Sequence, residues 1–131
     1  MNPLKPTEQE CSDILITAFD SAYGGCWYWA RPEGGRESWV IDNDGQSVND
    51  LYRAVHIVES DDDGPQRVFV VDHAVITRGL RRLVEGDCTF GGKPWENRKH
   101  ILGSLSDPGD IDAGIADVIV QAGLWGDIVY G

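Results

Sequence analysis

The sequence predicts an α+β fold in one domain, residues 1–131, with a small antiparallel sheet of about four strands packed with an N-terminal helix and C-terminal helices. Two observations predict this class. Stretches with apolar residues at helical spacing lie near the start and over the last third of the chain. Between them, short stretches rich in β-branched and aromatic residues are separated by Gly, Pro and Asp clusters, as in an antiparallel sheet.

The first expected helix begins at Thr7, because Thr7 and Glu10 have the spacing of a capping box. One face of this helix is apolar and consists of Cys11, Ile14, Leu15, Ala18, Phe19 and Ala22. We expect Gly24 and Gly25 to end the helix.

Four strands are expected next, over 26–30, 38–41, 52–59 and 67–71. Pro32 to Gly35 has turn composition, so the second strand is expected to return beside the first. The short acidic connection from Ser60 to Pro65 predicts that the third and fourth strands form an antiparallel hairpin.

A second helix is expected after Asp72, a suitable N-cap, and is expected to end at Gly86. Its inward positions are Val75, Ile76, Leu80 and Leu83. A loop over 87–94 and a short helix from Trp95 to about Leu105 should follow.

The last twenty or so residues, from Ile111, predict a terminal helix that is apolar over most of its circumference. Its polar positions are restricted to one stripe, Asp110, Gly114, Asp117 and Gln121. A helix of this kind must be covered from several sides. The sequence leaves two interpretations open, a central core element or a partial contact between copies of the chain.

Composition narrows the function classes. The formal net charge of −11 opposes binding to nucleic acid or to anionic membranes. The three cysteines, Cys11, Cys26 and Cys88, have no disulfide or zinc spacing, which indicates a reduced, cytoplasmic protein without a metal. Basic residues outnumber acidic ones only locally, between Arg78 and Lys99.

No motif indicates catalysis or a cofactor. The glycines from Gly86 to Gly92 resemble a phosphate-binding P-loop only loosely, because Pro94 replaces the required Ser or Thr. Asp42 to Gly45 lacks the closing Glu of a calcium loop, and no Ser lies in a nucleophile elbow. We therefore expect a binding protein and not an enzyme.

The five tryptophans are the most informative chemical feature. A flat ring could stack on an aromatic side chain while arginine holds a phosphate. Phe90 lies in the glycine-rich loop and has amide and charged neighbours. The candidate ligand-binding residues are Phe90, Asn97, Arg98, His100, Trp29 and Arg78. For Trp27 and Trp29, core packing remains the alternative.

Two stretches resemble a known family. The segment from Gly24 to Trp29, Gly-Gly-Cys-Trp-Tyr-Trp, and the segment from Ala116 to Gly131, with Ala-Asp-Val at its start and Ile-Val-Tyr-Gly at its end, are similar to the Thoeris anti-defence proteins of phages. Trp125 and Asp127 depart from the usual Phe and Glu.

The resemblance implies a non-catalytic sponge that sequesters a cyclic ADP-ribose isomer made by bacterial TIR proteins, with cyclic oligonucleotides as the alternative ligand. It also implies a homo-oligomer, a dimer or hexamer, acting in the host cytoplasm. A family aromatic and asparagine before the last helix fit Phe90 and Asn97 or His100. The alternatives are an acidic protein–protein inhibitor of a host factor and an enzyme that degrades the same signal.

Overall fold

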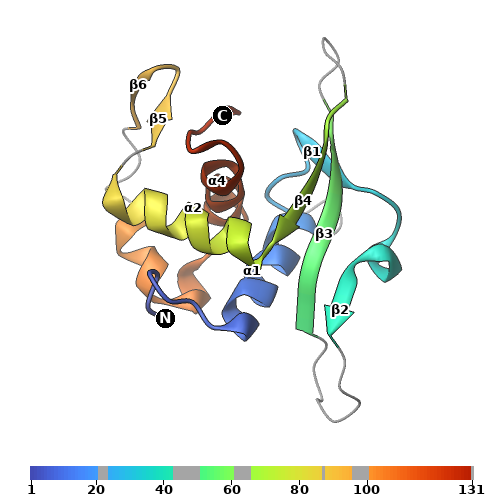
Figure 1. The fold of residues 1–131 in the computed structure, drawn as a ribbon. Coiled ribbons are helices and arrows are strands. Elements are labelled where there is room, and N and C mark those ends of the chain that lie inside the picture. The colour runs from blue at the N-terminus through green and yellow to red at the C-terminus, as the bar shows by residue number, and fades with distance from the viewer. Residues whose placement is uncertain (21–23, 43–50, 61–65, 87, 96–100, 131) are drawn as a thin grey trace.

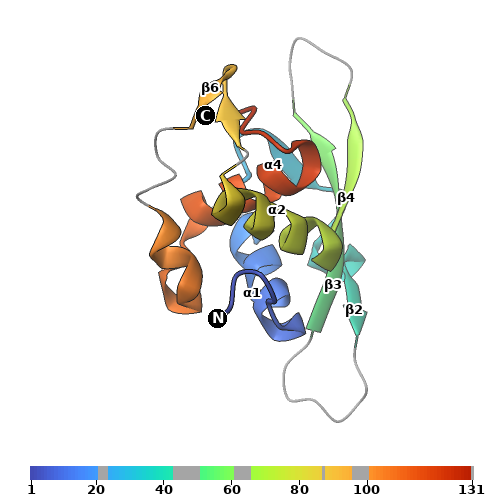
Figure 2. The same cartoon turned by 60° about the vertical axis from the view of Figure 1, so that its left-hand side comes forward.

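The computed structural model describes residues 1–20, 24–42, 51–60, 66–86, 88–95 and 101–130. Three α-helices pack together on one side of the sheet (Figures 1 and 2). The helices are α1 (Glu8–Phe19), α2 (His73–Glu85) and α4 (Ala113–Trp125), and the strands are β1 (Ala30–Pro32), β2 (Val40–Asp42), β3 (Leu51–Glu59), β4 (Val68–Asp72), β5 (Thr89–Phe90) and β6 (Lys93–Pro94). The predicted α+β class is confirmed.

Strand β3 is the centre of the four-stranded sheet, and all its pairings are antiparallel. β1 and β2 follow one another along the same edge of β3, opposite 57–59 and 51–54 respectively, and β4 occupies the other edge. The predicted β3–β4 hairpin is therefore confirmed, but the first two strands pair with β3 and not with each other.

The prediction of a strand over 26–30 is wrong, because this segment forms a turn. The backbone N–H groups of Trp29 and Ala30 both donate to the Cys26 carbonyl, at 3.1 and 2.9 Å. The turn buries the Trp29 side chain among the helices and the C-terminal residues, and the extended strand begins only at Ala30. A tertiary contact thus overrides the strand preference of consecutive aromatic residues.

Helix α1 begins with the predicted capping box but ends at Phe19, before Gly24 and Gly25. Its last carbonyls have other partners, since Gly25 N–H donates to Thr17 and Cys26 N–H to Ala18. This return of the chain requires a small residue at position 24, where a β-carbon would lie 2.6 Å from the Ala18 oxygen. The predicted inward position Ala22 lies outside the described residues.

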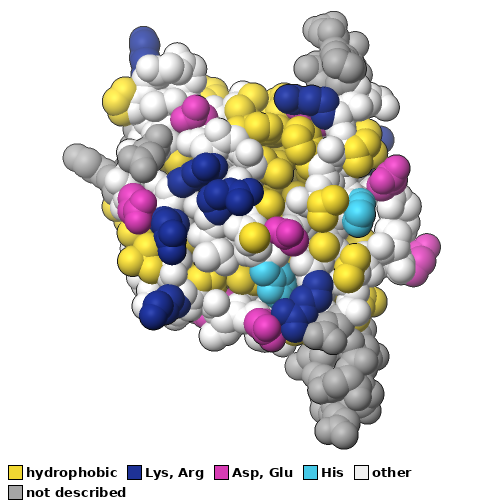
Figure 3. All heavy atoms as spheres, viewed as in Figure 1, with side chains coloured by type: hydrophobic (Ala, Val, Ile, Leu, Met, Phe, Trp, Pro, Cys, Tyr) yellow, Lys and Arg dark blue, Asp and Glu magenta, His cyan; other side chains and the backbone are white. Residues whose placement is uncertain are grey.

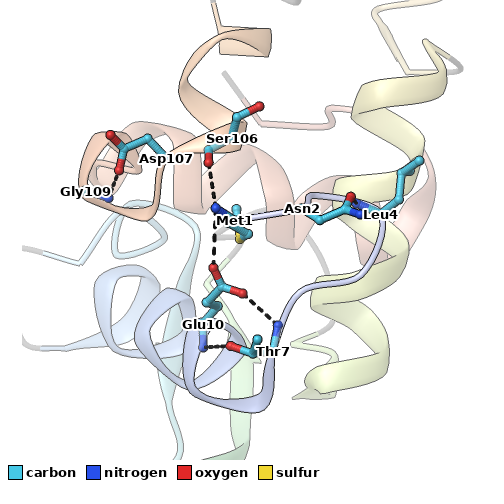
Figure 4. A network of polar contacts seen from close by, with 8 residues as sticks. All are labelled: Met1, Asn2, Leu4, Thr7, Glu10, Ser106, Asp107 and Gly109. Carbon is cyan, nitrogen blue, oxygen red and sulfur yellow. Dashed lines mark hydrogen bonds and ion pairs between the residues drawn. The ribbon is translucent and has the colours of Figure 1, made fainter.

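The lead-in to α1 is held by a polar network (Figure 4). The Met1 amino group donates to the Ser106 carbonyl at 2.8 Å and lies 3.9 Å from the Glu10 carboxylate. Glu10 also accepts the Thr7 backbone N–H at 2.8 Å as part of the capping box. Glu10 therefore connects the start of α1 with the 3₁₀ turn η3 (Ser104–Ser106).

The terminal helix α4 is the central core element, covered by α1 and α2 of the same chain. It crosses α2 so closely that a β-carbon at Gly79 would lie 2.0 Å from the Ile119 oxygen, and one at Gly123 would lie 2.1 Å from the Val75 oxygen. Side chains of α2 also bind the end of α4, where Arg78 Nε donates to Gly123 and Arg82 to Ala122.

The segments around α4 differ in part from the prediction. Helix α2 has the predicted cap, inward residues and left-handed Gly86 at its end. The predicted loop after α2 contains the short hairpin β5–β6. Two 3₁₀ turns, η3 and η4 (Pro108–Asp110), precede α4, while 96–100 lie outside the described residues.

No helix in the described part of the chain is both long and apolar enough to cross a membrane.

Candidate functional site

A pocket of about 250 Å³ lies where the end of α1 meets the turn before β1 and the 3₁₀ turn η2 (Arg36–Ser38). Its lining residues come from the C-terminal end of α1, the blue helix of Figure 1, and from the chain that leads through β1 towards β2. The residues that line it are Phe19, Asp20, Trp27, Arg31, Pro32, Gly34, Gly35, Arg36 and Trp39. Aromatic rings and guanidinium groups therefore share one small space.

Two indole N–H groups in the pocket walls have no hydrogen-bond partner. The Nε1 atoms of Trp27 and Trp39 are the buried side-chain nitrogens of the described chain that lack an acceptor. A buried donor without an acceptor costs about 1–3 kcal/mol, so native proteins rarely retain one without a reason. Neither nitrogen is exposed to solvent, so a ligand oxygen would reach it only after the pocket walls move.

Each tryptophan is covered by an arginine. The Arg31 guanidinium lies 5.3 Å from the Trp27 ring centroid, and the Arg36 guanidinium lies 5.4 Å from that of Trp39. Arg36 is also fixed by hydrogen bonds from Nε to the Tyr52 hydroxyl at 3.0 Å and from a terminal nitrogen to Asp20 at 3.1 Å.

Arg31 differs from Arg36 in its hydrogen bonding. Within the described part of the chain its guanidinium makes the contact with Trp27 but no hydrogen bond or ion pair. Arg31 therefore keeps all its N–H donors for a ligand.

The turn between the two arginines contributes two glycines, which have no side chains, to the lining of the pocket. Gly34 has a φ of +83°, in the left-handed region that favours glycine. At Gly35, a β-carbon would lie 2.4 Å from a carboxylate oxygen of Glu37. The turn predicted from Pro32 to Gly35 is confirmed, and it brings Arg31 and Arg36 to the same pocket.

A buried polar cluster holds the turn that carries Trp27. The Asp117 carboxylate accepts hydrogen bonds from the Tyr28 hydroxyl at 2.6 Å and from Trp29 Nε1 at 2.7 Å. Gln121 donates to the same carboxylate at 2.9 Å. Because Tyr28 and Trp29 directly follow Trp27, Asp117 fixes the position of the pocket wall from the core side. Of the polar stripe seen in the sequence, Asp117 and Gln121 are thus buried, whereas Asp110 and Gly114 are exposed.

Burial sets the ionisation of this cluster. Desolvation raises the pKa of Asp117, although the hydrogen bonds from Tyr28, Trp29 and Gln121 oppose the shift. Desolvation also raises the pKa of the Tyr28 hydroxyl and that of the Cys26 thiol, and in both cases Asp117 adds to the rise. Tyr28 and Cys26 are therefore neutral at physiological pH and serve the fold.

The described residues that line the pocket form no catalytic constellation. Asp20 is the carboxylate among its described lining residues, and it is paired with Arg36. The same lining includes no Ser, Cys, His or Lys that could act as a nucleophile or general base. In the described part of the chain, no group of three or more His, Cys, Asp and Glu side chains could hold a metal ion. The arrangement can bind an anion and stack a flat ring.

The residues proposed from the sequence lie on separate elements. Phe90 is at the end of β5, with 44% of its surface exposed. Trp29 is fully buried, its ring stacked on Tyr130 with centroids 5.3 Å apart, so it offers no free face to a ligand. Arg78 lies on α2 and donates to the Gly123 carbonyl. Asn97, Arg98 and His100 lie outside the described residues.

Trp27 and Trp39 are among the five tryptophans that stand out in the sequence, but Asp20, Arg31 and Arg36 were not predicted as site residues. A signal was present, because Arg31 and Arg36 flank the Pro-Glu-Gly-Gly turn with a tryptophan close by on either side. Asp20 gave no such signal, because its place at the pocket depends on where α1 ends.

Comparison of the chain with protein-family models, curated proteins and solved structures finds no significant match. The geometry of the site is therefore the main evidence for a function.

Proposed function

We propose that this protein binds and sequesters a small nucleotide-derived anion without cleaving it, and that the pocket between Trp27 and Trp39 is the binding site. One observation carries the proposal. Arg31, whose guanidinium has no ion pair in the described chain, lines the same 250 Å³ pocket as Trp27 and Trp39, whose buried indole N–H groups lack an acceptor.

The chemistry of the pocket favours a ligand that combines a ring with a phosphate. Guanidinium groups and indole N–H groups donate to phosphate oxygens, while indole rings stack on a base. Drug-sized ligands occupy pockets of about 300–1,000 Å³, so a pocket of 250 Å³ takes only part of a dinucleotide-sized molecule. The remainder of such a ligand would lie outside it.

The sequence resemblance supports a more specific proposal. A cyclic ADP-ribose isomer made by TIR proteins is the first ligand to test, with cyclic oligonucleotides next, and the biological setting would be phage anti-defence in the host cytoplasm. Absence of a catalytic constellation among the lining residues is compatible with a sponge. An enzyme acting on the same signal would need catalytic groups from elsewhere in the chain.

We also propose a homo-oligomer, but the structure supports it at a different surface from the apolar terminal helix that the sequence suggested. Helix α4 is covered within the chain, so it leaves no large apolar face for a partner. Apolar side chains are instead exposed on the sheet, namely Val40, Ile41, Val68 and Val70. Sedimentation analysis of Val70→Lys and of Val40→Lys would locate such a contact, because the two side chains are equally exposed. A parent protein that sediments as a monomer would refute the proposed homo-oligomer.

The test of sequestration is a thermal-shift screen of nucleotides followed by calorimetric titration. We expect saturable binding at one site per chain and recovery of the intact ligand after the protein is heated. Trp39→Phe removes one indole N–H and should weaken binding about tenfold, whereas Phe90→Ala serves as a control outside the pocket. A cleaved ligand would indicate an enzyme, and a Phe90-dependent affinity would move the site to the β5–β6 hairpin.

An acidic protein–protein inhibitor remains the second candidate function. It is favoured by the net charge of −11 together with the exposed valines of β4. Figure 3 shows hydrophobic side chains gathered beside the arginines that lie over α2. The two candidates differ in the ligand screen, because a purely protein-binding inhibitor would show no nucleotide-dependent stabilisation.

A further inference from the structure

The charges that line the pocket do not balance. Two guanidinium groups, on Arg31 and Arg36, share the pocket with the Asp20 carboxylate. Asp20 Oδ1 lies 3.1 Å from a terminal nitrogen of Arg36. This ion pair leaves one positive charge, that of Arg31, without a counter-charge among the lining residues. Residues 21–23, which lie outside the described ranges, carry no charged side chain in the sequence.

We infer that Asp20 is a specificity-determining residue. Because of Asp20, the pocket binds a phosphodiester, which has one negative charge, more tightly than it binds a terminal phosphate monoester. The inference rests on the proposed function and deepens it. A phosphodiester carries one negative charge and matches the one uncompensated guanidinium. A terminal phosphate carries about −1.5 to −2 at pH 7, so its additional charge would be repelled by Asp20.

Hydrogen-bond geometry points in the same direction. A terminal phosphate is bound best by the two-pronged fork of an arginine. In Arg36, Nε is occupied by the Tyr52 hydroxyl and one terminal nitrogen by Asp20, so the fork is already engaged. Of the two arginines that line the pocket, Arg31 is the one whose fork is unengaged within the described chain. The pocket therefore has one complete anion-binding group.

The charged groups that line the pocket are Asp20, Arg31 and Arg36. No histidine is among the described lining residues, so between pH 5.5 and 7.5 the group expected to titrate is a terminal phosphate itself.

The experiment compares 3′,5′-cyclic AMP with 5′-AMP, which share the base and sugar and differ in phosphate charge. At pH 7.5 and low salt we expect the protein to bind the cyclic nucleotide about three- to tenfold more tightly. Asp20→Asn should tighten 5′-AMP binding by a similar factor and remove most of the preference. Asp13→Asn is the matched control, because Asp13 is an exposed acid on α1 that does not line the pocket.

A second measurement uses the unmodified protein and does not depend on the folding of a variant. The second pKa of a phosphate monoester is about 6, so 5′-AMP approaches a single negative charge at pH 5.5. The ratio of the affinities for the cyclic nucleotide and for 5′-AMP should therefore decrease from pH 7.5 to pH 5.5. Two results would overturn the inference while leaving the proposed binding function standing. In the first, the protein binds both nucleotides but its preference for the cyclic nucleotide does not change with pH. In the second, Asp20→Asn changes this preference no more than Asp13→Asn does. If neither nucleotide binds at millimolar concentration, the inference is overturned, whereas the proposed function is decided by the screen of larger nucleotides.

Discussion

Two aromatic clusters in this molecule use the same side chains for different purposes. In the first, Trp29 lies between Trp125 and Tyr130, with ring centroids 5.1 and 5.3 Å away, and its indole N–H binds Asp117. In the second, Trp27 and Trp39 lie beneath arginines, and their N–H groups have no acceptor. The two clusters therefore differ in the completeness of their hydrogen bonds, and the second, incomplete one lines the proposed binding site.

The first cluster is complete because α4 supplies a polar partner from within the core. Asp117 accepts donors from Trp29, Tyr28 and Gln121, and Gln121 in turn accepts the backbone N–H groups of Val129 and Tyr130. The second cluster has no equivalent carboxylate, because Asp20 is engaged by Arg36. Substitutions should therefore affect stability in the first cluster and ligand affinity in the second.

The largest effect is expected for Trp29→Phe. This change removes a hydrogen bond to a buried carboxylate and leaves a small cavity, so the free energy of unfolding should fall by about 3 kcal/mol. Trp39→Phe removes no hydrogen bond seen in the described chain and should cost only about 1 kcal/mol. Urea denaturation of both variants checks the difference. Equal losses would show that the two clusters are energetically alike.

Arg31→Ala should leave stability unchanged while nucleotide affinity falls about tenfold, because Arg31 makes no ion pair within the described chain. The loss should shrink at high salt, where screening already weakens the contact in the parent protein. Calorimetric titrations at two salt concentrations measure both effects. An affinity that is the same with and without Arg31 would remove this residue from the site.

The pH dependence of unfolding should reveal two carboxylates whose pKa values shift in opposite directions on folding. The folded-state pKa of Asp117 is raised by desolvation, so its contribution to stability grows as pH falls through this raised pKa towards the ordinary carboxylate value. The pKa of Glu59 is lowered, chiefly by hydrogen bonding from Arg67, so its contribution is present above the ordinary value and lost as pH falls through the lowered pKa.

Melting curves from neutral to acidic pH test these two directions. Relative to the parent protein, Asp117→Asn should remove a gain in stability on mild acidification. Glu59→Gln should lose stability at neutral pH and converge with the parent at low pH. A parallel pH profile for Glu59→Gln and the parent would contradict the assigned shift.

The smallest effect is expected for Phe90→Ala. The ring is 44% exposed at the end of a two-residue strand, so its removal should change the free energy of unfolding by less than about 1 kcal/mol. Nucleotide affinity should also stay the same if the ligand occupies the pocket between Trp27 and Trp39. A ten- to hundredfold loss of affinity would instead support the site proposed from the sequence.

Local signals were sufficient for most of the fold. The Thr7 capping box, the Asp72 cap and the alternating residues of β3 act within a few positions of one another, so the pattern alone predicts the elements. The turn at Cys26 could not be predicted in this way, because it depends on the partner of Trp29 at Asp117, far along the chain. The pocket was missed for the same reason, since Asp20 and Trp39 meet only after the sheet has formed.

The close crossing of α2 and α4 has a consequence for how the molecule opens. At Gly79 and Gly123 the backbones are in direct contact, and arginines of α2 cover the last carbonyls of α4. Neither helix can separate from the other without losing these contacts together. In native-state hydrogen exchange, the amides of both helices should therefore share one slow opening event, while the β5–β6 hairpin exchanges by faster local openings.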